Sequence, residues 1–420
     1  MPEELARRLG TTDAVVVGLS AMIGAGVFAA FAPAAAVAGD WLLVSLALAA
    51  VVAYCNATSS ARLAALYPES GGTYVYGRRR LGPLWGYLAG WGFTVGKTAS
   101  CAAMALTFGA YVAPGLERPL AVAAVAALTL LNLLGVQRSA GAARIIVTFV
   151  LAVLLAVVVA GLTGDDEIRF GWFAYEPLPQ DPYPFEVGSV LQAAGLLFFA
   201  FAGYARIATL GEEVRDPART IPRAVGIALG ITLVVYLLVA LAALRTLKPL
   251  LLAQSRAPLS DLVKEAGYGW LAPVVGAGAA VAALGALLAL LLGVSRTVLA
   301  MARERDLPGA LAVVDPARRV PRRAELAVGG AVIVLLLVAD LREAIGFSSF
   351  GVLVYYAIAN ACALTLGREE GAPPRAVPVA GLVLCLVLAA TLPAASVVAG
   401  LAVFAAGLAI YALRRRHPAG

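Results

Sequence analysis

The chain is built from long apolar stretches separated by short polar segments, and most charged residues fall in those segments. A helix needs about 20 predominantly apolar residues to cross a bilayer, and stretches of this length recur along the whole sequence. The pattern predicts an all-α integral membrane protein with about twelve transmembrane helices. Their expected ranges are 14–38, 41–66, 84–114, 119–136, 142–162, 188–209, 223–244, 270–300, 324–341, 344–366, 376–393 and 395–413.

Two of the predicted spans differ from plain apolar helices. Gly24 and Gly26 lie at the centre of the first span, and Gly203 lies near the middle of the sixth. Glycine in a helix interior costs about 1 kcal/mol relative to alanine, so its presence at mid-depth needs a reason. Five spans separate the starts of these two segments. This spacing is typical of a five-plus-five inverted repeat whose corresponding helices are interrupted near the bilayer midplane.

An interrupted helix in a membrane frees main-chain N–H and C=O groups that protein, water or ligand must satisfy. The half-helix that starts at the break directs a positive dipole end at an anion. We therefore expect the N–H groups of Gly24, Ala25 and Gly26 to bind a substrate carboxylate. The carbonyls that we expect to accept from a substrate ammonium lie at Ala21, Met22, Ile23, Phe199, Ala200 and Ala202.

Helix packing is an alternative explanation of the first span. Ala21, Ala25 and Ala29 form a small-xxx-small series, which lets two helices approach closely in a membrane. Taken alone, the first span fits both interpretations. The second interrupted span at the matching position favours a binding site.

Composition agrees with the apolar pattern. Hydrophobic residues make up 61% of the chain and charged residues 14%, with a mean hydropathy of +0.89. These values exceed what a water-facing surface tolerates and leave few residues for a soluble domain. The four cysteines lie inside apolar spans without metal-ligand spacing, and the only histidine, His417, lies in the tail. We expect no enzyme activity, no metal and no cofactor.

The net charge of +7 does not indicate a nucleic-acid partner, because the basic residues occur loop by loop on alternate sides of the spans. By the positive-inside rule, those loops and both termini are expected to be cytoplasmic. The opposite loops are sparse or acidic, as at Asp165, Asp166 and Glu167. The loop with Arg245, Lys248, Arg256 and Lys264 fits this rule less well. The expected cytoplasmic arginines are Arg7, Arg8, Arg78, Arg79, Arg80, Arg138, Arg144, Arg215, Arg219, Arg223, Arg303, Arg305, Arg318, Arg319, Arg322, Arg323, Arg368, Arg375 and Arg414 to Arg416.

Four segments resemble the signatures of the amino acid-polyamine-organocation superfamily of secondary transporters. They are GLSAMIGAGVF, YPESGGTYVYGRRRLG, FFAFAGYARIATLGEEVRDPARTIPRA and GVSRTVLAMARERDLP. The resemblance implies a core of ten helices that alternates between outward-open and inward-open states around a midplane amino acid site. This core is expected in residues 1–370, and residues 371–420 are expected to hold helices 11 and 12 with a cytoplasmic tail.

The resemblance also implies roles for individual residues. Phe199 matches the aromatic residue of the sixth helix that covers the substrate and closes the outer gate. The PESGG segment corresponds to the cytoplasmic loop after helix 2, where Tyr74 and Tyr76 can lie at the membrane interface. The loop after helix 6 holds charged residues that either pair when the inner gate shuts or form a solvated loop. They are Glu212, Glu213, Arg215, Asp216 and Arg219.

Lys97 is the strongest single signal in the chain. A lysine near the middle of an apolar span costs about 2.5 to 3.5 kcal/mol on insertion scales and marks a candidate functional site. Phe93, Lys97 and Cys101 share one helix face by their i, i+4 spacing, and in the family this face of helix 3 borders the substrate. We expect Lys97 to provide a titratable or fixed positive charge at the site. The alternative is a structural lysine that snorkels or pairs with a buried acid.

Coupling and substrate class follow from departures from the family pattern. Some proton-coupled relatives place a lysine in helix 5, where this chain has Val150. Helix 8 has no serine or threonine from Val274 to Val294, which disfavours sodium, since sodium takes oxygen ligands. In the sixth helix, Ala205 replaces an acid that many relatives carry. Together with Lys97, this loss disfavours cationic substrates. The small residues Ala21, Ala25 and Ala202 around the break leave apolar room, which favours neutral amino acids. Arg206 is expected to pair with Glu212, Glu213 or the loop rather than to contact the substrate.

These observations predict a multi-pass plasma-membrane transporter of amino acids, proton-coupled and sodium-independent, working by alternating access. Its expected partners are an amino acid substrate and the lipid bilayer, with no protein partner evident. The first alternative is an exchanger of amino acids or amines, and a remote one is a channel or a membrane receptor. The predicted substrate-binding residues are Ala21, Met22, Ile23, Gly24, Ala25, Gly26, Phe93, Cys101, Phe199, Ala200, Ala202 and Gly203, with Lys97 for coupling.

Overall fold

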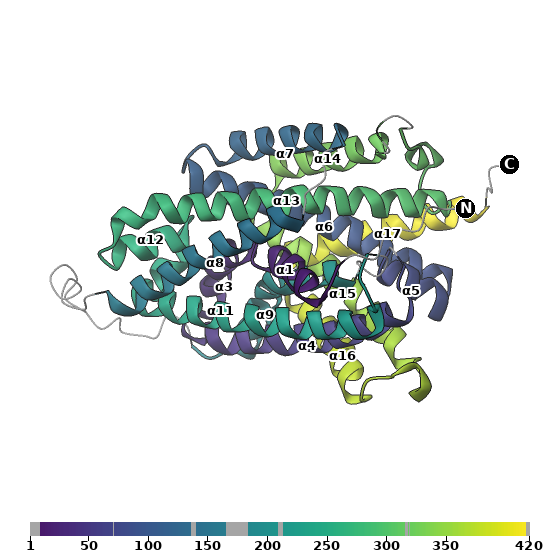
Figure 1. Ribbon diagram of the computed structural model, residues 1–420, viewed down its shortest axis with the longest axis horizontal. Helices are drawn as coiled ribbons and strands as arrows, with labels where there is room; N and C mark the ends of the chain where they lie inside the picture. The colour runs from purple at the N-terminus through teal and green to yellow at the C-terminus, as the bar shows by residue number, and fades with distance from the viewer. Residues whose placement is uncertain are drawn as a thin grey trace.

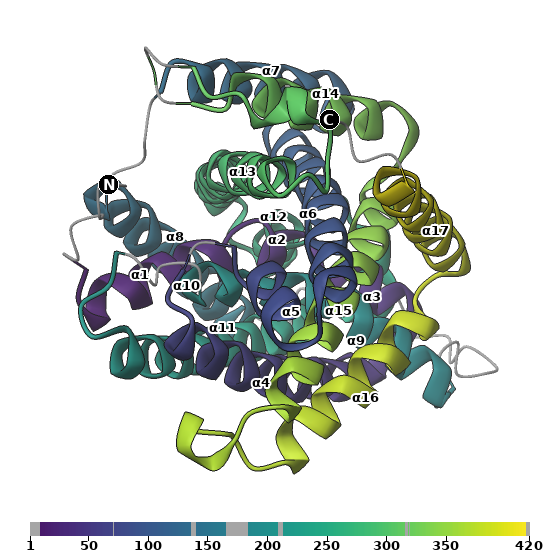
Figure 2. The same ribbon diagram turned by 90° about the vertical axis from the view of Figure 1, so that its right-hand side faces the viewer.

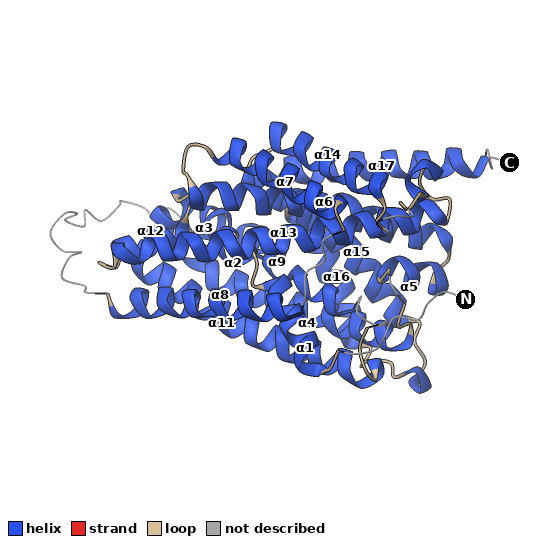
Figure 3. Ribbon diagram, turned by 45° about the horizontal axis from the view of Figure 1, so that its top comes forward, coloured by secondary structure: helices blue, strands red, loops and turns tan. Residues whose placement is uncertain are grey.

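The computed structural model describes residues 9–69, 71–135, 140–164, 184–208, 213–315, 318 and 320–416. In this part of the chain every regular element is helical, apart from one isolated bridge between Leu9 and Val214 (Figure 3). Several residues singled out in the sequence lie outside the described residues: Arg7, Arg8, Arg138, Asp165, Asp166, Glu167, Glu212, Arg319 and His417.

Each of the predicted apolar ranges overlaps a helix, and the first and sixth ranges are divided. The first range is split among α1 (Thr11–Met22), α2 (Gly26–Ala29) and α3 (Phe31–Ala38). The sixth is split among α9 (Val187–Phe201), the 3₁₀ turn η3 (Ala202–Tyr204) and α10 (Ala205–Ala208). The other long helices are α4 (Leu42–Leu66), α6 (Pro83–Val112), α7 (Glu117–Leu133), α8 (Ala140–Thr163), α11 (Pro217–Gln254), α13 (Ala272–Arg303), α14 (Arg322–Val338), α15 (Leu341–Leu364), α16 (Ala376–Thr391) and α17 (Ala394–Arg416).

Short helices lie at the ends of the long ones. They are η1 (Gly39–Trp41), α5 (Thr73–Arg80), α12 (Pro258–Glu265), η4 (Gly269–Leu271), η5 (Gly309–Ala312) and η6 (Arg368–Glu370). One long helix is kinked: Lys248 in α11 has φ 55° and ψ 163°. Pro249 follows it, and a residue before proline is disfavoured in the helical region, so the kink falls where the sequence requires it.

Eight helical segments among the described residues are long and apolar enough to cross a membrane: Thr11–Ala29, Phe31–Leu66, Gly141–Thr163, Val187–Ala208, Pro217–Gln254, Gly269–Arg303, Leu341–Leu364 and Ala394–Arg414. Large aliphatic side chains cover the outside of the bundle; Ile145 is 73% exposed and Val398 is 66% exposed. Such a surface is stable only against lipid. The fold is that of a multi-pass helical membrane protein.

The long helices run along the length of the molecule (Figure 1). Seen end-on, α7 and α14 lie side by side at one edge, α17 lies at the periphery, and α4 and α16 form the opposite side (Figure 2). Helix α6 packs along both α13 and α15, and α1 packs against η3 and α10. This packing brings the two divided spans together in the interior.

Candidate functional site

The interruption in the first span lies where the glycines predicted it. Helix α1 ends at Met22, and Ile23 leaves the helical region with φ −84° and ψ 47°. The next helix begins at Gly26. The Met22 carbonyl oxygen accepts a hydrogen bond of 2.6 Å from the Tyr236 hydroxyl. A side chain of α11 therefore satisfies one of the main-chain groups that the break sets free.

The interruption in the sixth span is a tight turn rather than an open break. Ala202 to Tyr204 form the 3₁₀ turn η3 between α9 and α10. The Ala200 carbonyl oxygen accepts 3.0 Å from Tyr236, and the Ala202 carbonyl oxygen accepts 3.2 Å from the Lys97 ammonium. Tyr236 is fully buried and reaches carbonyls of both divided spans.

The two interruptions pack backbone against backbone. A Cβ atom added to Gly203 would lie 2.4 Å from the main-chain carbon and oxygen of Ala21. A Cβ atom added to Gly26 would lie 2.6 Å from the Cα of Ala200. Both distances are far below van der Waals contact, so only glycine permits this approach. The glycines predicted to permit unusual geometry also permit the two spans to touch.

A cavity of about 430 Å³ borders both interruptions. It runs along α13 from Ala286 to Ala300, which at the helical rise of 1.5 Å per residue is about 21 Å. Helices α1, α6, α10 and α15 form the other walls. The lining residues are Leu9, Val17, Ser20, Ala21, Gly71, Phe93, Lys97, Ser100, Met104, Ala143, Phe199, Ala202, Gly203, Ala205, Arg206, Glu213, Ala286, Ala289, Leu290, Gly293, Arg296, Thr297, Ala300 and Tyr355.

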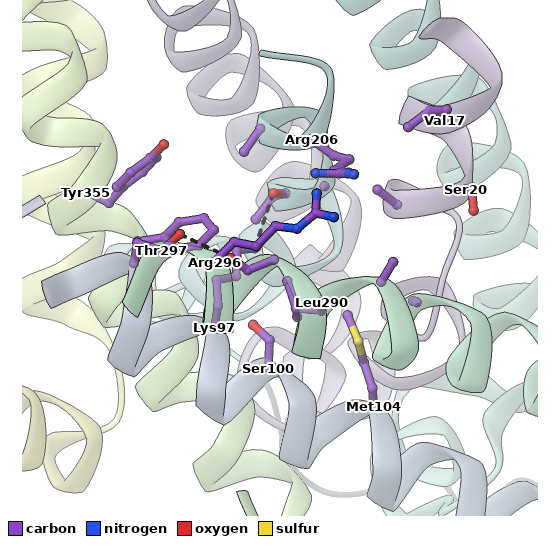
Figure 4. A pocket seen from close by; sticks show the side chains of 18 of the residues that line it. Val17, Ser20, Lys97, Ser100, Met104, Arg206, Leu290, Arg296, Thr297 and Tyr355 are labelled. Atoms are coloured by element: carbon purple, nitrogen blue, oxygen red, sulfur yellow. Dashed lines mark hydrogen bonds between the residues drawn. The ribbon is translucent and has the colours of Figure 1, made fainter. Parts of the chain in front are cut away.

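The cavity wall carries more positive than negative charge. Lys97 projects from α6, Arg206 from α10 and Arg296 from α13 (Figure 4), and Glu213 is the only acid among the described lining residues. Glu213 attracts Arg206 electrostatically, whereas Arg296 repels it. Glu212, the other predicted partner of Arg206, lies outside the described residues. No group of three or more metal-ligating side chains occurs within the described residues.

About half of the predicted site residues line this cavity. Ala21, Phe93, Lys97, Phe199, Ala202 and Gly203 do so. Met22, Ile23, Gly24, Ala25, Gly26, Cys101 and Ala200 are buried and do not line it. Gly24 is covered by Ala286, since a Cβ atom added to Gly24 would lie 2.8 Å from the Ala286 methyl carbon. The proposed carboxylate donors thus lie one layer behind the cavity wall.

Sequence reasoning missed several lining residues. Ser100 and Met104 follow Lys97 at i+3 and i+7, so helical periodicity alone could have found them. Arg296 lies inside a predicted span, and an arginine at such a position is itself a signal of function. Tyr355 of α15 carried no signal in the sequence. Its hydroxyl oxygen accepts 3.1 Å from the Thr73 N–H, which ties α5 to the cavity wall.

A polar cluster beside the cavity connects α5 to the end of α13. The Asp306 carboxylate accepts 2.8 Å from the Tyr74 hydroxyl and 2.8 Å from the Arg78 guanidinium, which also pairs with Glu304 at 3.0 Å. Burial raises the pKa of Asp306, and the bonds from Tyr74 and Arg78 oppose that rise. Burial also raises the pKa of Tyr74. Tyr74 and Tyr76 are 3% and 1% exposed, so their rings pack inside the protein rather than on its surface.

The loop after the sixth span meets the start of the first. The Leu9 N–H donates 3.0 Å to the Glu213 carbonyl, and the Arg215 N–H donates 2.9 Å to the Leu9 carbonyl. Leu9 and Glu213 both line the cavity, so this contact forms its rim. The Arg219 Nε atom lies 3.9 Å from the Asp216 Oδ2 atom, and both side chains are well exposed, as expected of a solvated loop.

The family model and the relatives that match this chain all describe transporters or permeases. The family model described as "Amino acid permease" matches residues 9–413. An uncharacterised transporter of Mycobacterium tuberculosis is 63% identical over 421 residues, covering 99% of this chain and 93% of the relative. The branched-chain amino acid permease of Bacillus subtilis is 27% identical, covering 99% of this chain and 94% of the relative. A vacuolar cationic amino acid transporter of Arabidopsis thaliana is 28% identical, and the match covers 90% of this chain and 65% of the relative.

Proposed function

Because this chain belongs to the amino acid permease family, we propose that it is a secondary active transporter that moves amino acids across the plasma membrane by alternating access. The proposed architecture has twelve spans. An inverted five-plus-five repeat in residues 1–370 forms the transport core, and residues 371–420 hold the last two helices. Both termini and the basic loops are cytoplasmic in this proposal. The cavity then opens inward, because Leu9, Gly71 and Glu213 lie at its rim.

One observation carries the proposal. The cavity borders both interruptions, and the Lys97 ammonium binds the Ala202 carbonyl at the second of them. In transporters built from inverted repeats, interrupted helices that face each other at mid-depth form the substrate site. A channel or a receptor does not require two such interruptions beside one cavity. An enzyme is excluded by the family.

Lys97 supplies the proposed coupling step. While Lys97 is protonated, its charge-assisted hydrogen bond occupies the Ala202 carbonyl and holds η3 against α6. Loss of the proton weakens this bond and frees the carbonyl for the ammonium group of a substrate. Substrate and proton then favour different states of the same element, which is the requirement for coupling. The N–H groups of Gly24, Ala25 and Gly26 remain the proposed carboxylate donors. They are exposed when Ala286 of α13 moves away.

Sodium independence is supported by the chemistry of α13. This helix offers no hydroxyl ligand from Val274 to Val294. The Ser295 hydroxyl contacts the Leu292 carbonyl at 3.0 Å and the Glu325 carboxylate at 2.6 Å, on the side away from the cavity. Exclusion of cationic substrates is supported by Lys97, Arg206 and Arg296 in the cavity wall. Neutral amino acids are the proposed substrate class.

The test is uptake by proteoliposomes of a panel of labelled neutral, acidic and cationic amino acids. Imposed pH or sodium gradients identify the driving ion, and liposomes preloaded with unlabelled amino acids or amines separate exchange from symport. Because substrate and proton compete at the Ala202 carbonyl, the proposal predicts saturable uptake that an outward proton gradient drives and sodium leaves unchanged. Uptake that follows the sodium gradient, or flux that does not saturate, would contradict it.

A further inference from the structure

Two of the segments that are long and apolar enough to cross a membrane end in arginines that meet. They are Gly269–Arg303 and Ala394–Arg414, and Figure 1 shows α13 and α17 ending at the same end of the bundle. The Arg414 guanidinium donates a hydrogen bond of 3.4 Å to the main-chain carbonyl oxygen of Arg305, just past the end of α13. Arg303 and Arg305 are exposed. The contact therefore holds a positive charge of α17 beside the arginines of α13.

Arg305 occupies a backbone position that favours glycine. Its φ is 62°, in the left-handed region. The Arg305 N–H donates 3.1 Å to the Ala302 carbonyl, and the Asp306 N–H donates 2.8 Å to the Met301 carbonyl, which is the Schellman pattern of a helix end. Glycine is the usual residue there, because a Cβ atom is strained in this conformation. The positive charge of Arg305 is a property that the usual glycine does not supply.

The two acids of this segment are already bound elsewhere. Glu304 pairs with Arg78 at 3.0 Å, and Asp306 pairs with the same guanidinium at 2.8 Å. Among the described residues, neither acid forms an ion pair with the arginines at the ends of α13 and α17. With Arg78 counted, four arginines and two acids make up the described cluster, so it keeps a net positive charge at neutral pH.

An apolar surface adjoins the arginines. Helix α17 lies at the periphery of the bundle (Figure 2), and the Tyr87 hydroxyl of α6 fixes it there by donating 2.8 Å to the Gly407 carbonyl. Leu408 and Leu413 of α17 are 42% and 59% exposed. The end of α17 thus offers positive charge and apolar side chains together, which is the pattern that the headgroup and acyl chains of a lipid require.

We propose that Arg303, Arg305 and Arg414 bind the phosphate group of an anionic phospholipid whose acyl chains lie along α17. Guanidinium groups bind phosphate oxygens through paired, charge-assisted hydrogen bonds. Both segments end at these arginines, which places the arginines at the level of the lipid headgroups. A bound phosphate also offsets the repulsion between the arginines. The inference goes beyond the proposed transport function and does not depend on it.

The alternative is a general attraction between basic residues and an anionic membrane surface. In that case any two exposed arginines near a helix end contribute alike. Arg118 and Arg342, which are exposed in the first turns of α7 and α15 and lie outside this cluster, provide the matched control. A specific site responds to the loss of its own arginines and not to the loss of these two.

The experiment measures the unfolding temperature of the purified protein in a neutral detergent during titration with phosphatidylglycerol, phosphatidylcholine or inorganic phosphate. A lipid that binds only the folded protein raises this temperature, and the concentration dependence gives an apparent Kd. We expect phosphatidylglycerol to stabilise wild type more than phosphatidylcholine does. Arg305→Gln/Arg414→Gln should weaken the apparent Kd for phosphatidylglycerol about 25-fold, about fivefold for each arginine. Arg118→Gln/Arg342→Gln should match wild type.

Arg305→Gly provides a second measurement that survives if the double variant does not fold. This variant relieves the left-handed strain and removes one charge. We expect it to unfold at a higher temperature than wild type without anionic lipid, and to bind phosphatidylglycerol about fivefold more weakly.

Three results would overturn the inference. One is an unchanged response to phosphatidylglycerol in both the double variant and Arg305→Gly. Another is an equal loss in the two double variants, which would show a general charge effect. The third is an equal shift from inorganic phosphate, which would show that the site takes a free anion rather than a lipid. A failed transport assay would overturn the proposed function and leave this inference standing.

Discussion

The Lys97 ammonium donates a hydrogen bond of 3.2 Å to the Ala202 carbonyl oxygen, across 105 positions of the sequence. This bond joins the buried lysine of α6 to the turn that interrupts the sixth span. The carbonyl satisfies the buried charge, and the charge satisfies a carbonyl that the 3₁₀ turn exposes. Neither group is stable there without a partner, so this contact links the charge state of Lys97 to the shape of the cavity wall.

Replacement of Lys97 by methionine tests that link. Methionine has a similar length and no charge, so the Ala202 carbonyl loses its donor. We expect proteoliposome uptake whose rate no longer depends on the imposed pH gradient, or uptake reduced at least about tenfold. Lys264→Met, at an exposed lysine that pairs with Asp261 at 3.0 Å, is the matched control and should behave as wild type. Normal pH-driven uptake by Lys97→Met would rule out its role in coupling.

Tyr236 connects the two interruptions, and its hydroxyl can be removed without changing the packing of its ring. In Tyr236→Phe the Met22 and Ala200 carbonyls both lose their donor. A buried acceptor left unsatisfied costs about 1–3 kcal/mol, so we expect a lower unfolding temperature in detergent and slower uptake. Tyr54→Phe, at a 58% exposed tyrosine of α4, should leave both unchanged. Equal stability of the two variants would show that these bonds contribute nothing.

Gly203 tests whether the two divided spans must touch. The Cβ of Gly203→Ala would overlap the Ala21 main chain and force the spans apart. Overpacking of this kind costs about 1–3 kcal/mol, and we expect most uptake to be lost. Gly226→Ala on α11 is the control, because no atom lies within 4 Å of its added Cβ. Full activity of Gly203→Ala would mean that the contact is not needed for transport.

The Asp306 cluster predicts a pH dependence of stability. Burial raises the pKa of this carboxyl in the folded protein above its unfolded value of about 3.9. Its contribution to stability is therefore fully present below about pH 4 and is lost as the pH rises through the folded pKa. Melting temperatures in detergent from pH 4 to 7 should show wild type losing stability relative to Asp306→Asn as the pH rises. Glu304→Gln should follow wild type, whereas parallel curves for wild type and Asp306→Asn would contradict the assignment.

Local features of the fold could be predicted from the sequence. The apolar ranges became helices because only helices satisfy the backbone in lipid, and Gly24 and Gly26 marked the first interruption because glycine is costly in a helix. Lys97 was predicted to need a partner because it is a charge in an apolar span, and the structure gives it the Ala202 carbonyl; its functional role stays a prediction. In each case the physical cause acts within one segment, so the sequence of that segment was enough to predict the feature.

Features that depend on distant contacts could not be predicted. Nothing in the local pattern of α11 indicates that Tyr236 reaches Met22, which lies 214 positions earlier. Tyrosine is a residue type common at membrane interfaces, but the Tyr74 hydroxyl donates a hydrogen bond to Asp306, 232 positions later, inside the protein. The place of Gly24 behind Ala286 also depends on how α13 packs against α1. Spacing along one helix defines its faces but not the neighbour that each face meets.

The most direct test of the account is an experimental structure of the protein determined with a transported amino acid bound. The account predicts density for the ligand in the cavity between α1 and η3, in contact with Ala21, Ala202 or Lys97. It also predicts that the first span is interrupted after Met22, where α1 ends. A structure in which the first and sixth spans are continuous, fully hydrogen-bonded helices with no cavity between them, or in which the ligand binds elsewhere, would contradict it.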